Sequence, residues 1–298
     1  MIEGENMKQK KKTNSAGTLL TGVVAWVFSF LLVLIAALGV IIFTVCNPGY
    51  MRSQVLSSGF CKSAFEQLNE NYTSYGNAGN IPTEVMTSII TEDQIQQDMF
   101  KAVDALYQGD RRLIAHPEVA EAAMEKIEQN LQDRGIQMTD EIKTAIQDVA
   151  NGCQTDYDNY VQLLITPYVA PYITKISTMA WMGMGILVFA AIFALLVLLN
   201  LQKATPARLR WCSYSFLGAA FFSVLVPLLF TVFVKMDQLN LEPETLKLLL
   251  VSYTNSGVNV FFYFALIYAV IVAALIIAWQ KGLKRYRQVY NENKVYNS

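Results

Sequence analysis

Residues 18–45 read TLLTGVVAWVFSFLLVLIAALGVIIFTV, a run without a single Asp, Glu, Lys, Arg or His. Three more runs in the 298-residue chain are equally free of charge: Ser177–Leu201, Trp211–Val234 and Gly257–Gln280. Each exceeds the ~20 apolar residues that cross a hydrocarbon core of ~30 Å. Because hydrocarbon offers the backbone no hydrogen-bond partner, such runs form helices. The sequence therefore predicts four transmembrane helices, at 18–45, 177–201, 211–234 and 257–280.

The composition indicates the same class of protein. Hydrophobic residues make up 53% of the chain and charged residues only 16%, whereas a soluble protein carries about 25% charged residues. The first run also follows Lys8 and Lys10–Lys12, as a cleaved signal peptide would. The apolar region of a signal peptide is only ~7–15 residues long, however, so we expect a retained signal anchor.

The distribution of positive charge predicts the orientation. Segments 1–17, 202–210 and 281–298 together carry twelve basic and three acidic residues, a net charge of +9. Since the whole chain has a net charge of −1, the remainder carries −10. Short segments rich in Lys and Arg stay in the cytoplasm. We therefore expect a multi-pass protein of the cell (plasma) membrane with both termini cytoplasmic, and with residues 46–176 and 235–256 outside.

Residues 46–176 are long enough for a small domain, and their spacing of apolar residues is helical. Helix starts are predicted at Thr91, which forms a capping box with Gln94, and at Pro117 and Thr139. A separate helix is expected near Tyr157–Leu164, and a loop at Asn69–Ile81. In the segment 235–256, Glu242-Pro243-Glu244 predicts the start of a short interfacial helix. The fold class is an all-α integral membrane protein with a helical extracytoplasmic domain between spans 1 and 2.

Three cysteines, Cys46, Cys61 and Cys153, fall in this outer segment. A disulfide between Cys61 and Cys153 would join its first helix to its last, and such a long loop gives ~4–5 kcal/mol of stabilisation in the chain-entropy model. Free thiols are the equal alternative, because spacing does not determine pairing. Asn71-Tyr72-Thr73 is an N-glycosylation triplet, and Asn71 is the candidate acceptor in a suitable host.

The motifs of common enzyme classes are missing. The sequence contains no P-loop, no G-x-G-x-x-G, no G-x-S-x-G and no H-E-x-x-H. The single His116 precedes Pro117 at a helix start and is interpreted as a surface residue. The acidic groups lack the spacing of a Ca²⁺ loop. We therefore expect no catalytic residue, no cofactor and no metal site.

The uncharged runs carry small residues one helical turn apart, which let helices approach closely. These candidate helix-packing residues are Ser215, Ala219 and Ser223 in the third run, and Ala265, Ala269 and Ala273 in the fourth. No ionisable residue lies inside any of the four runs, which disfavours an ion-coupled transporter. The ladders predict a compact four-helix bundle or a site for a partner's helix.

These features favour a non-enzymatic binding, sensing or scaffold protein of the cell envelope that acts through its outer helical domain. Its expected partners are the lipid bilayer, a ligand or protein at the outer domain, and a second copy of the chain, but no nucleic acid. The layout also resembles that of FtsX-type proteins, which implies a membrane subunit that works with an ATPase. The outer segment, however, lacks the strand pattern expected of that family. A small oligomeric channel is a further alternative.

Overall fold

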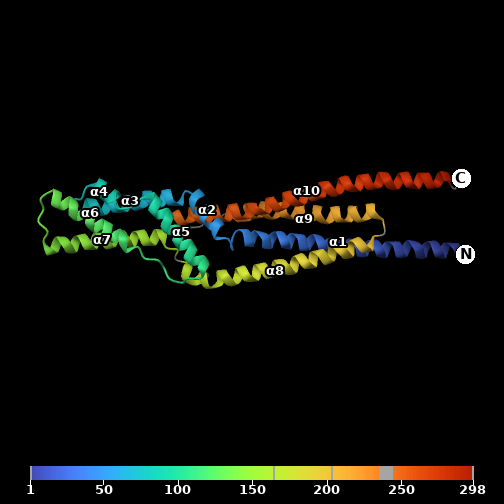
Figure 1. Ribbon diagram of the computed structural model, residues 1–298, viewed down its shortest axis with the longest axis horizontal. Helices are drawn as coiled ribbons and strands as arrows, with labels where there is room; N and C mark the ends of the chain where they lie inside the picture. Colours follow the sequence, from blue (N-terminus) through green and yellow to red (C-terminus); the bar gives the residue numbers. More distant parts are fainter. Residues whose placement is uncertain (1, 164, 203, 235–243, 297–298) are drawn as a thin grey trace. The chain divides into compact units, whose positions relative to one another are not determined.

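The computed structural model describes residues 2–163, 165–202, 204–234 and 244–296, and within them the side chains of residues 17 to 284 except that of Glu244. All regular structure in these ranges is α-helical. The helices (Figure 1) are α1 (Ile2–Phe43), α2 (Pro48–Ser57), α3 (Phe60–Ala78), α4 (Thr83–Thr87), α5 (Glu92–Gln108), α6 (Pro117–Asp133), α7 (Asp140–Val161), α8 (Thr166–Leu201), α9 (Thr205–Phe233) and α10 (Glu244–Tyr296).

The chain divides into two compact units. The first, which we call the span unit, consists of Met1–Ile42, Met179–Val234 and Gly257–Ser298. The second, the helical unit, consists of Phe43–Thr178 and Lys235–Ser256. Each unit has its own cluster of buried apolar side chains, so each is a packed body in its own right.

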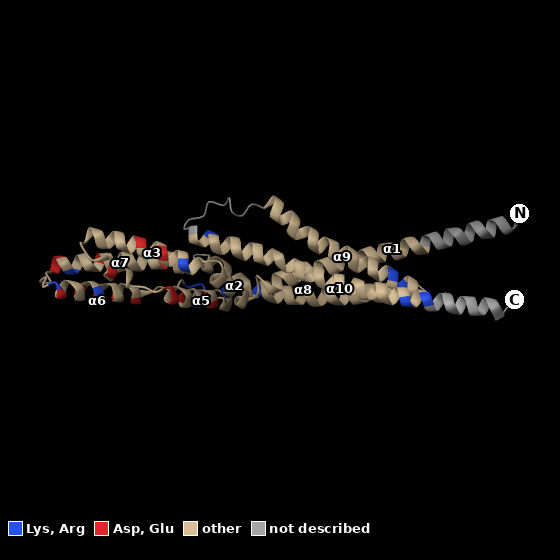
Figure 2. Ribbon diagram, turned by 90° about the horizontal axis from the view of Figure 1, so that it is seen from above, with Lys and Arg blue, Asp and Glu red and all other residues tan. Residues whose placement is uncertain are grey.

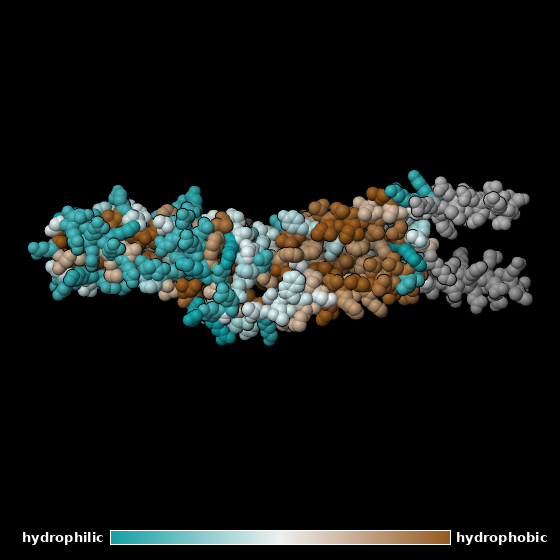
Figure 3. Space-filling view, in the orientation of Figure 1, coloured by the Kyte–Doolittle hydropathy of each residue, from teal (hydrophilic) through white to brown (hydrophobic). Residues whose placement is uncertain are grey.

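Four helical stretches are long and apolar enough to cross a membrane, as the four uncharged runs predict. They lie within Gly17–Phe43, Asp140–Leu201, Thr205–Phe233 and Thr245–Lys284. Large apolar side chains, among them Trp26, Phe193 and Phe221, are exposed on their outer faces, and the span unit accordingly has a hydrophobic surface in Figure 3. Such a surface is stable in contact with lipid and unfavourable in contact with water.

Close contacts to backbone hold the span unit together. The Ser215 hydroxyl on α9 donates to the Ala25 carbonyl of α1 at 2.9 Å, and the Tyr268 hydroxyl on α10 donates to the Leu32 carbonyl at 2.8 Å. Gly39 of α1 faces the ring of Phe264, which a Cβ atom at position 39 would meet at 2.4 Å. Helix α1 therefore packs directly against α9 and α10.

The small residues of α9 lie inside this unit. Ser215, Ala219 and Ser223 are all buried, at 2%, 0% and 0% exposure. Gly218 is also close to α1, because a Cβ atom there would come within 2.7 Å of the Ser29 hydroxyl. The absence of bulk on this face allows the backbone of α9 to approach α1.

The small residues of α10, spaced four apart, are only partly buried in the span unit. Ala265 is buried, but Ala269 and Ala273 are exposed, so of these three only Ala265 packs inside the bundle of this chain. Tyr268 and Val272 are buried instead. An α-helix has 3.6 residues per turn, so a residue four positions further along is rotated by ~40° about the helix axis. A series of residues spaced strictly by four therefore winds around the helix and leaves the buried face, which follows alternating steps of three and four.

In the helical unit, the helix starts predicted at Thr91, Pro117 and Thr139 are confirmed. The Thr91 side chain accepts a hydrogen bond from the Gln94 amide at 3.1 Å, and Thr139 accepts one from Ile142 at 3.3 Å. Pro117 begins α6. Gly109, with a φ of 80°, ends α5 in the left-handed conformation that glycine adopts without strain.

Two local predictions are wrong. The stretch Asn69–Ile81 is not a loop, because α3 continues to Ala78. Its Asn and Gly residues favour a turn, but Tyr72 and Gly76 are buried on one face of α3, and this tertiary packing outweighs local propensity. The separate helix expected near Tyr157–Leu164 is also absent, since α7 is continuous from Asp140 to Val161.

The helices beside the spans also begin differently from the prediction. Helix α8 starts at Thr166 and contains Pro171. The short interfacial helix expected in 235–256 is instead the first part of α10, which begins at Glu244. Residues 235–243, with Glu242 and Pro243, lie outside the described residues. Helices α8 and α10 therefore begin in the sequence segments of the helical unit and continue through the second and fourth uncharged runs.

Gly76 gives a test of this packing. A Cβ atom there would lie 2.6 Å from the Cγ atom of buried Met86 and 3.2 Å from the Ile81 carbonyl oxygen. We expect Gly76→Ala to destabilise the chain by about 1–3 kcal/mol through overpacking. The measurement is the thermal midpoint, followed by circular dichroism of the full chain in detergent.

The matched control is Gly152→Ala in α7. Its new Cβ atom would meet only the Tyr75 ring, at 3.7 Å, which is an ordinary contact. Helix propensity should therefore raise the midpoint, by up to about 1 kcal/mol of stability. If both variants gain stability, the tight approach of α3 to Met86 is incorrect.

Candidate functional site

The helical unit contains an apolar cavity of about 400 Å³. Its wall is formed by residues of α2, α5, α8 and α10 and by the segments that precede α2 and α8. The lining residues are Val45, Met51, Leu106, Tyr107, Leu163, Ile165, Val169, Ile173, Ile176, Leu246, Leu249, Leu250 and Tyr253. This volume lies within the ~300–1,000 Å³ typical of ligand pockets.

The only polar side chains among these lining residues are those of two tyrosines. The Tyr107 hydroxyl donates to the Val45 carbonyl at 3.0 Å. Tyr253 packs edge-on against Tyr50, with ring centroids 5.2 Å apart, and its carbonyl accepts the Tyr50 hydroxyl at 3.0 Å. Burial raises the pKa of Tyr107 to about 12, so this group stays neutral. The cavity therefore offers an uncharged, apolar wall.

Three of the lining residues adjoin the uncharged runs of the sequence. Val45 is the last residue of the first run, Ile176 immediately precedes the second, and Tyr253 lies four residues before Gly257 at the start of the fourth. Helices rise only ~1.5 Å per residue, so each of these positions is within one or two turns of an apolar span along its own helix or segment. Along the chain, the cavity wall thus includes residues that directly adjoin the uncharged runs.

A second feature of the helical unit is a buried polar network around Asp98 of α5, which is 2% exposed. Its carboxylate accepts hydrogen bonds from the Tyr157 hydroxyl at 2.8 Å and from the Lys101 ammonium at 2.7 Å. Burial, with Asp98 as the next cause, raises the pKa of Tyr157. The hydrogen bond to Asp98 raises the pKa of Lys101. Both donors compensate the desolvation of a buried carboxylate.

His116 belongs to the same network and is also 2% exposed, so its interpretation as a surface residue is wrong. It is the N-cap residue of α6. Its Nδ1 atom lies 2.7 Å from the Asp158 carboxylate of α7, and its backbone amide donates to the same oxygen at 3.2 Å. Its ring stacks edge-on against Tyr157, with centroids 5.2 Å apart. The neighbouring Pro117 fixes the helix start, and α7 covers the imidazole.

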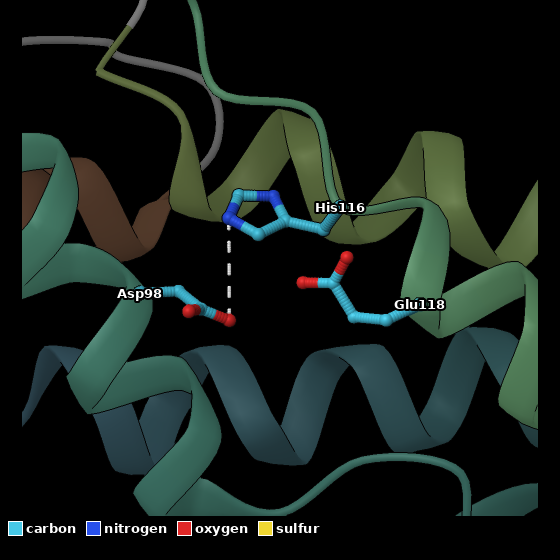
Figure 4. A group of neighbouring side chains, drawn as sticks. All are labelled: Asp98, His116 and Glu118. Carbon is cyan, nitrogen blue, oxygen red and sulfur yellow. Dashed lines mark ion pairs between the residues drawn. The ribbon is translucent and has the colours of Figure 1, made fainter.

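One group of side chains in the described part of the chain has the arrangement of metal ligands. The Asp98 carboxylate, the His116 imidazole and the Glu118 carboxylate each offer one atom, and these atoms lie within 4.8 Å of one another (Figure 4). Asp98 and His116 are buried, and Glu118 is exposed. Sequence reasoning missed this group because Asp98 is eighteen positions from His116 and its burial depends on α7.

The predicted disulfide is absent, and Cys46, Cys61, Cys153 and Cys212 are all free. The Cys61 thiol lies 3.9 Å from the Val55 carbonyl. The Cys153 carbonyl instead accepts the Tyr72 hydroxyl at 2.8 Å. Tyr72 follows Cys61 by about 16 Å along α3 at 1.5 Å per residue, whereas a disulfide needs Cα atoms within ~7 Å. The two thiols therefore lie at different levels of the bundle.

Asn71 is not in a loop either. It lies in α3 and is half-buried. Its amide nitrogen donates to the Asp156 carboxylate of α7 at 3.1 Å, and Tyr75 donates to the same oxygen at 2.9 Å. A glycosylation acceptor is expected in a surface loop. The structure therefore assigns Asn71 a packing contact between α3 and α7.

Comparison of the chain with protein-family models, with curated proteins and with solved structures gave no significant match. The cavity and the polar network are therefore interpreted from their own chemistry.

The state of the two buried thiols can be measured directly. Burial raises the pKa of Cys61 to about 11 and that of Cys153 to about 12, so both remain protonated and unreactive at pH 8. We expect iodoacetamide to modify neither thiol in the native protein and both in the denatured protein without prior reduction. Peptide mass spectrometry identifies the modified residues. Alkylation of denatured Cys61 and Cys153 only after reduction would show that they are bonded.

Proposed function

We propose that this chain is a four-span membrane protein whose helical unit lies outside the cytoplasm and binds the acyl chain of a membrane lipid. The observation that carries this proposal is the apolar cavity of about 400 Å³. Three of its lining residues adjoin uncharged runs along the sequence. The protein is thus a binding component of the cell envelope rather than an enzyme.

The charge distribution supports the orientation. Residues 17–42, 179–234 and 257–284 of the span unit include no Asp or Glu, whereas acidic side chains occur on α3, α5, α6 and α7 of the helical unit (Figure 2). The basic residues of the span unit include Arg208, Arg210, Lys281 and Lys284, which flank the uncharged runs. Basic flanks of this kind are retained in the cytoplasm. An acidic helical unit is then on the opposite side.

The chemistry of the wall supports an acyl chain as the occupant. A hydrocarbon chain needs no hydrogen bond, and each CH₂ group that it transfers from water gains ~0.8 kcal/mol. The wall has no charged side chain that would lose its hydration. Three of its lining residues adjoin uncharged runs along the chain, so a membrane lipid is the source of the acyl chain that we favour. A soluble metabolite would require polar contacts that this wall lacks.

The orientation can be tested with one exposed position in each compartment. We expect Gln129→Cys, on the exposed face of α6, to react with a membrane-impermeant maleimide on intact cells. An epitope fused after Ser298 should become accessible to antibody only after the cells are permeabilised. Access to the epitope on intact cells would contradict the proposed orientation.

Lipid binding can be tested with a phospholipid that carries a photoactivatable diazirine in its acyl chain. After illumination of the full chain in vesicles, we expect labelled peptides that contain Leu106 and Tyr107 of α5, because these residues line the cavity. Filling the cavity with Val169→Trp should reduce this labelling about fivefold or more. Peptide mass spectrometry measures the yield at each site.

The control variant is Val149→Trp in α7, a partly buried position outside the cavity wall. It introduces the same side chain into the same unit and should leave labelling of α5 unchanged. Labelling of the exposed apolar face of α9 provides the internal reference in every sample. Equal labelling of α5 in the two variants would exclude the cavity as the binding site.

A further inference from the structure

The group Asp98, His116 and Glu118 combines residues from the middle of α5 and the start of α6. Figure 4 shows the imidazole and the two carboxylates directed toward a common region between these helices. The offered ligand atoms lie within 4.8 Å of one another, and the His116 Nε2 atom is 4.0 Å from an Asp98 carboxylate oxygen. This separation is too long for a hydrogen bond.

The Nε2 atom of His116 is buried without a hydrogen-bond partner. The side chain as a whole is only 3% exposed, so water does not compensate this atom. On the other side of the ring, Nδ1 lies 2.7 Å from the Asp158 carboxylate, which can only accept when ionised. Nδ1 therefore carries a hydrogen toward Asp158, and Nε2, on the opposite side of the ring, is directed toward Asp98. An unpaired buried imidazole nitrogen beside two carboxylates is an arrangement typical of a metal ligand set.

We propose that Asp98, His116 and Glu118 bind one divalent transition-metal ion of the zinc class. Imidazole nitrogen and carboxylate oxygen are ligands that Zn²⁺ accepts at about 2.0–2.2 Å. Ligand atoms of a tetrahedral ion with such bonds lie about 3.4 Å apart, so the 4.0 Å between Nε2 and the Asp98 oxygen shortens when the ion binds. Glu118 is exposed, so its carboxylate is free to move toward the ion when the site closes. Solvent completes the coordination.

The surrounding side chains support this ligand set. Asp158 holds the imidazole by its Nδ1 atom, as the outer carboxylate does in carboxylate–histidine–metal arrangements. The Tyr157 hydroxyl orients the Asp98 carboxylate. Lys101 is the one opposing group, since its ammonium contacts the other Asp98 oxygen at 2.7 Å. Its side chain is 64% exposed and can turn into solvent when the ion binds.

The test uses the full chain in detergent, purified without a histidine tag and treated with chelator. The probes are Zn²⁺, followed by calorimetry and by competition with a chromophoric chelator, and Co²⁺, whose visible absorption reports nitrogen and oxygen coordination. We expect one ion per chain and a higher thermal midpoint with Zn²⁺, because an ion that binds the folded state stabilises it. Chelator should reverse the increase.

Two carboxylates of the same helix provide the decisive comparison. Glu118→Gln should weaken Zn²⁺ binding about tenfold or more, whereas Glu125→Gln, an equally exposed Glu two turns along α6, should leave it unchanged. His116→Asn should abolish stoichiometric binding and the Co²⁺ spectrum, with circular dichroism as the check on folding. Because the two Glu variants change only exposed side chains, they remain informative if His116→Asn unfolds.

Absence of stoichiometric binding to the wild-type chain would overturn the proposal. Equal affinities of Glu118→Gln and Glu125→Gln would also overturn it. Either result would mean that His116 serves the fold alone, through its contacts with Asp158 and Tyr157.

Discussion

A chain that crosses hydrocarbon must satisfy each backbone N–H and C=O group within its own helix, because no water is present to bond with it. This constraint commits the four uncharged runs to helix, whatever their side chains prefer. Packing between the helices then depends on close approach rather than on the hydrophobic effect. Ser215, Tyr268 and Gly39 show the result: two hydroxyls bond backbone carbonyls of α1, and a missing side chain admits the Phe264 ring. The exposed surface remains apolar because lipid covers it at no cost.

The helical unit packs like a protein in water, with an apolar core from which water is excluded. Its carboxylates and amides favour water, so those that are buried need hydrogen-bond partners. Tyr72 and Tyr157 are fully buried, yet each hydroxyl has a partner, in the Cys153 carbonyl and the Asp98 carboxylate. Burying Asp98 is costly unless donors surround it, and Tyr157 and Lys101 supply them. The His116 Nε2 atom is the exception within this network. Its lack of a partner, where its neighbours Asp98, Tyr157 and Asp158 each have one, supports the proposed role in binding.

The spans and the helix starts were predictable because their signals are local. An uncharged run is visible in one window of sequence, and Thr91, Pro117 and Thr139 act within a single turn. The extent of α3 was not predictable, because Tyr72 and Gly76 keep Asn-rich sequence helical through contacts with α7 and Met86. The burial of His116 was missed for the same reason, since it depends on Asp158, forty-two positions away. The cavity has no local signal at all: its wall combines residues from Val45 to Tyr253.

Helix α5 belongs to both features of the helical unit. Asp98 lies in the polar network, and Leu106 and Tyr107, about two turns further along the same helix, line the cavity. An ion that ties Asp98 to α6 would restrict the position of α5, and an acyl chain against Leu106 would do the same from the other end. If each ligand favours one position of α5, each must change the affinity for the other by the same factor, because thermodynamic coupling is reciprocal. Without a shift of α5 the two sites are independent. The rigidity of this one helix therefore determines whether the helical unit has two separate binding sites or a single coupled one.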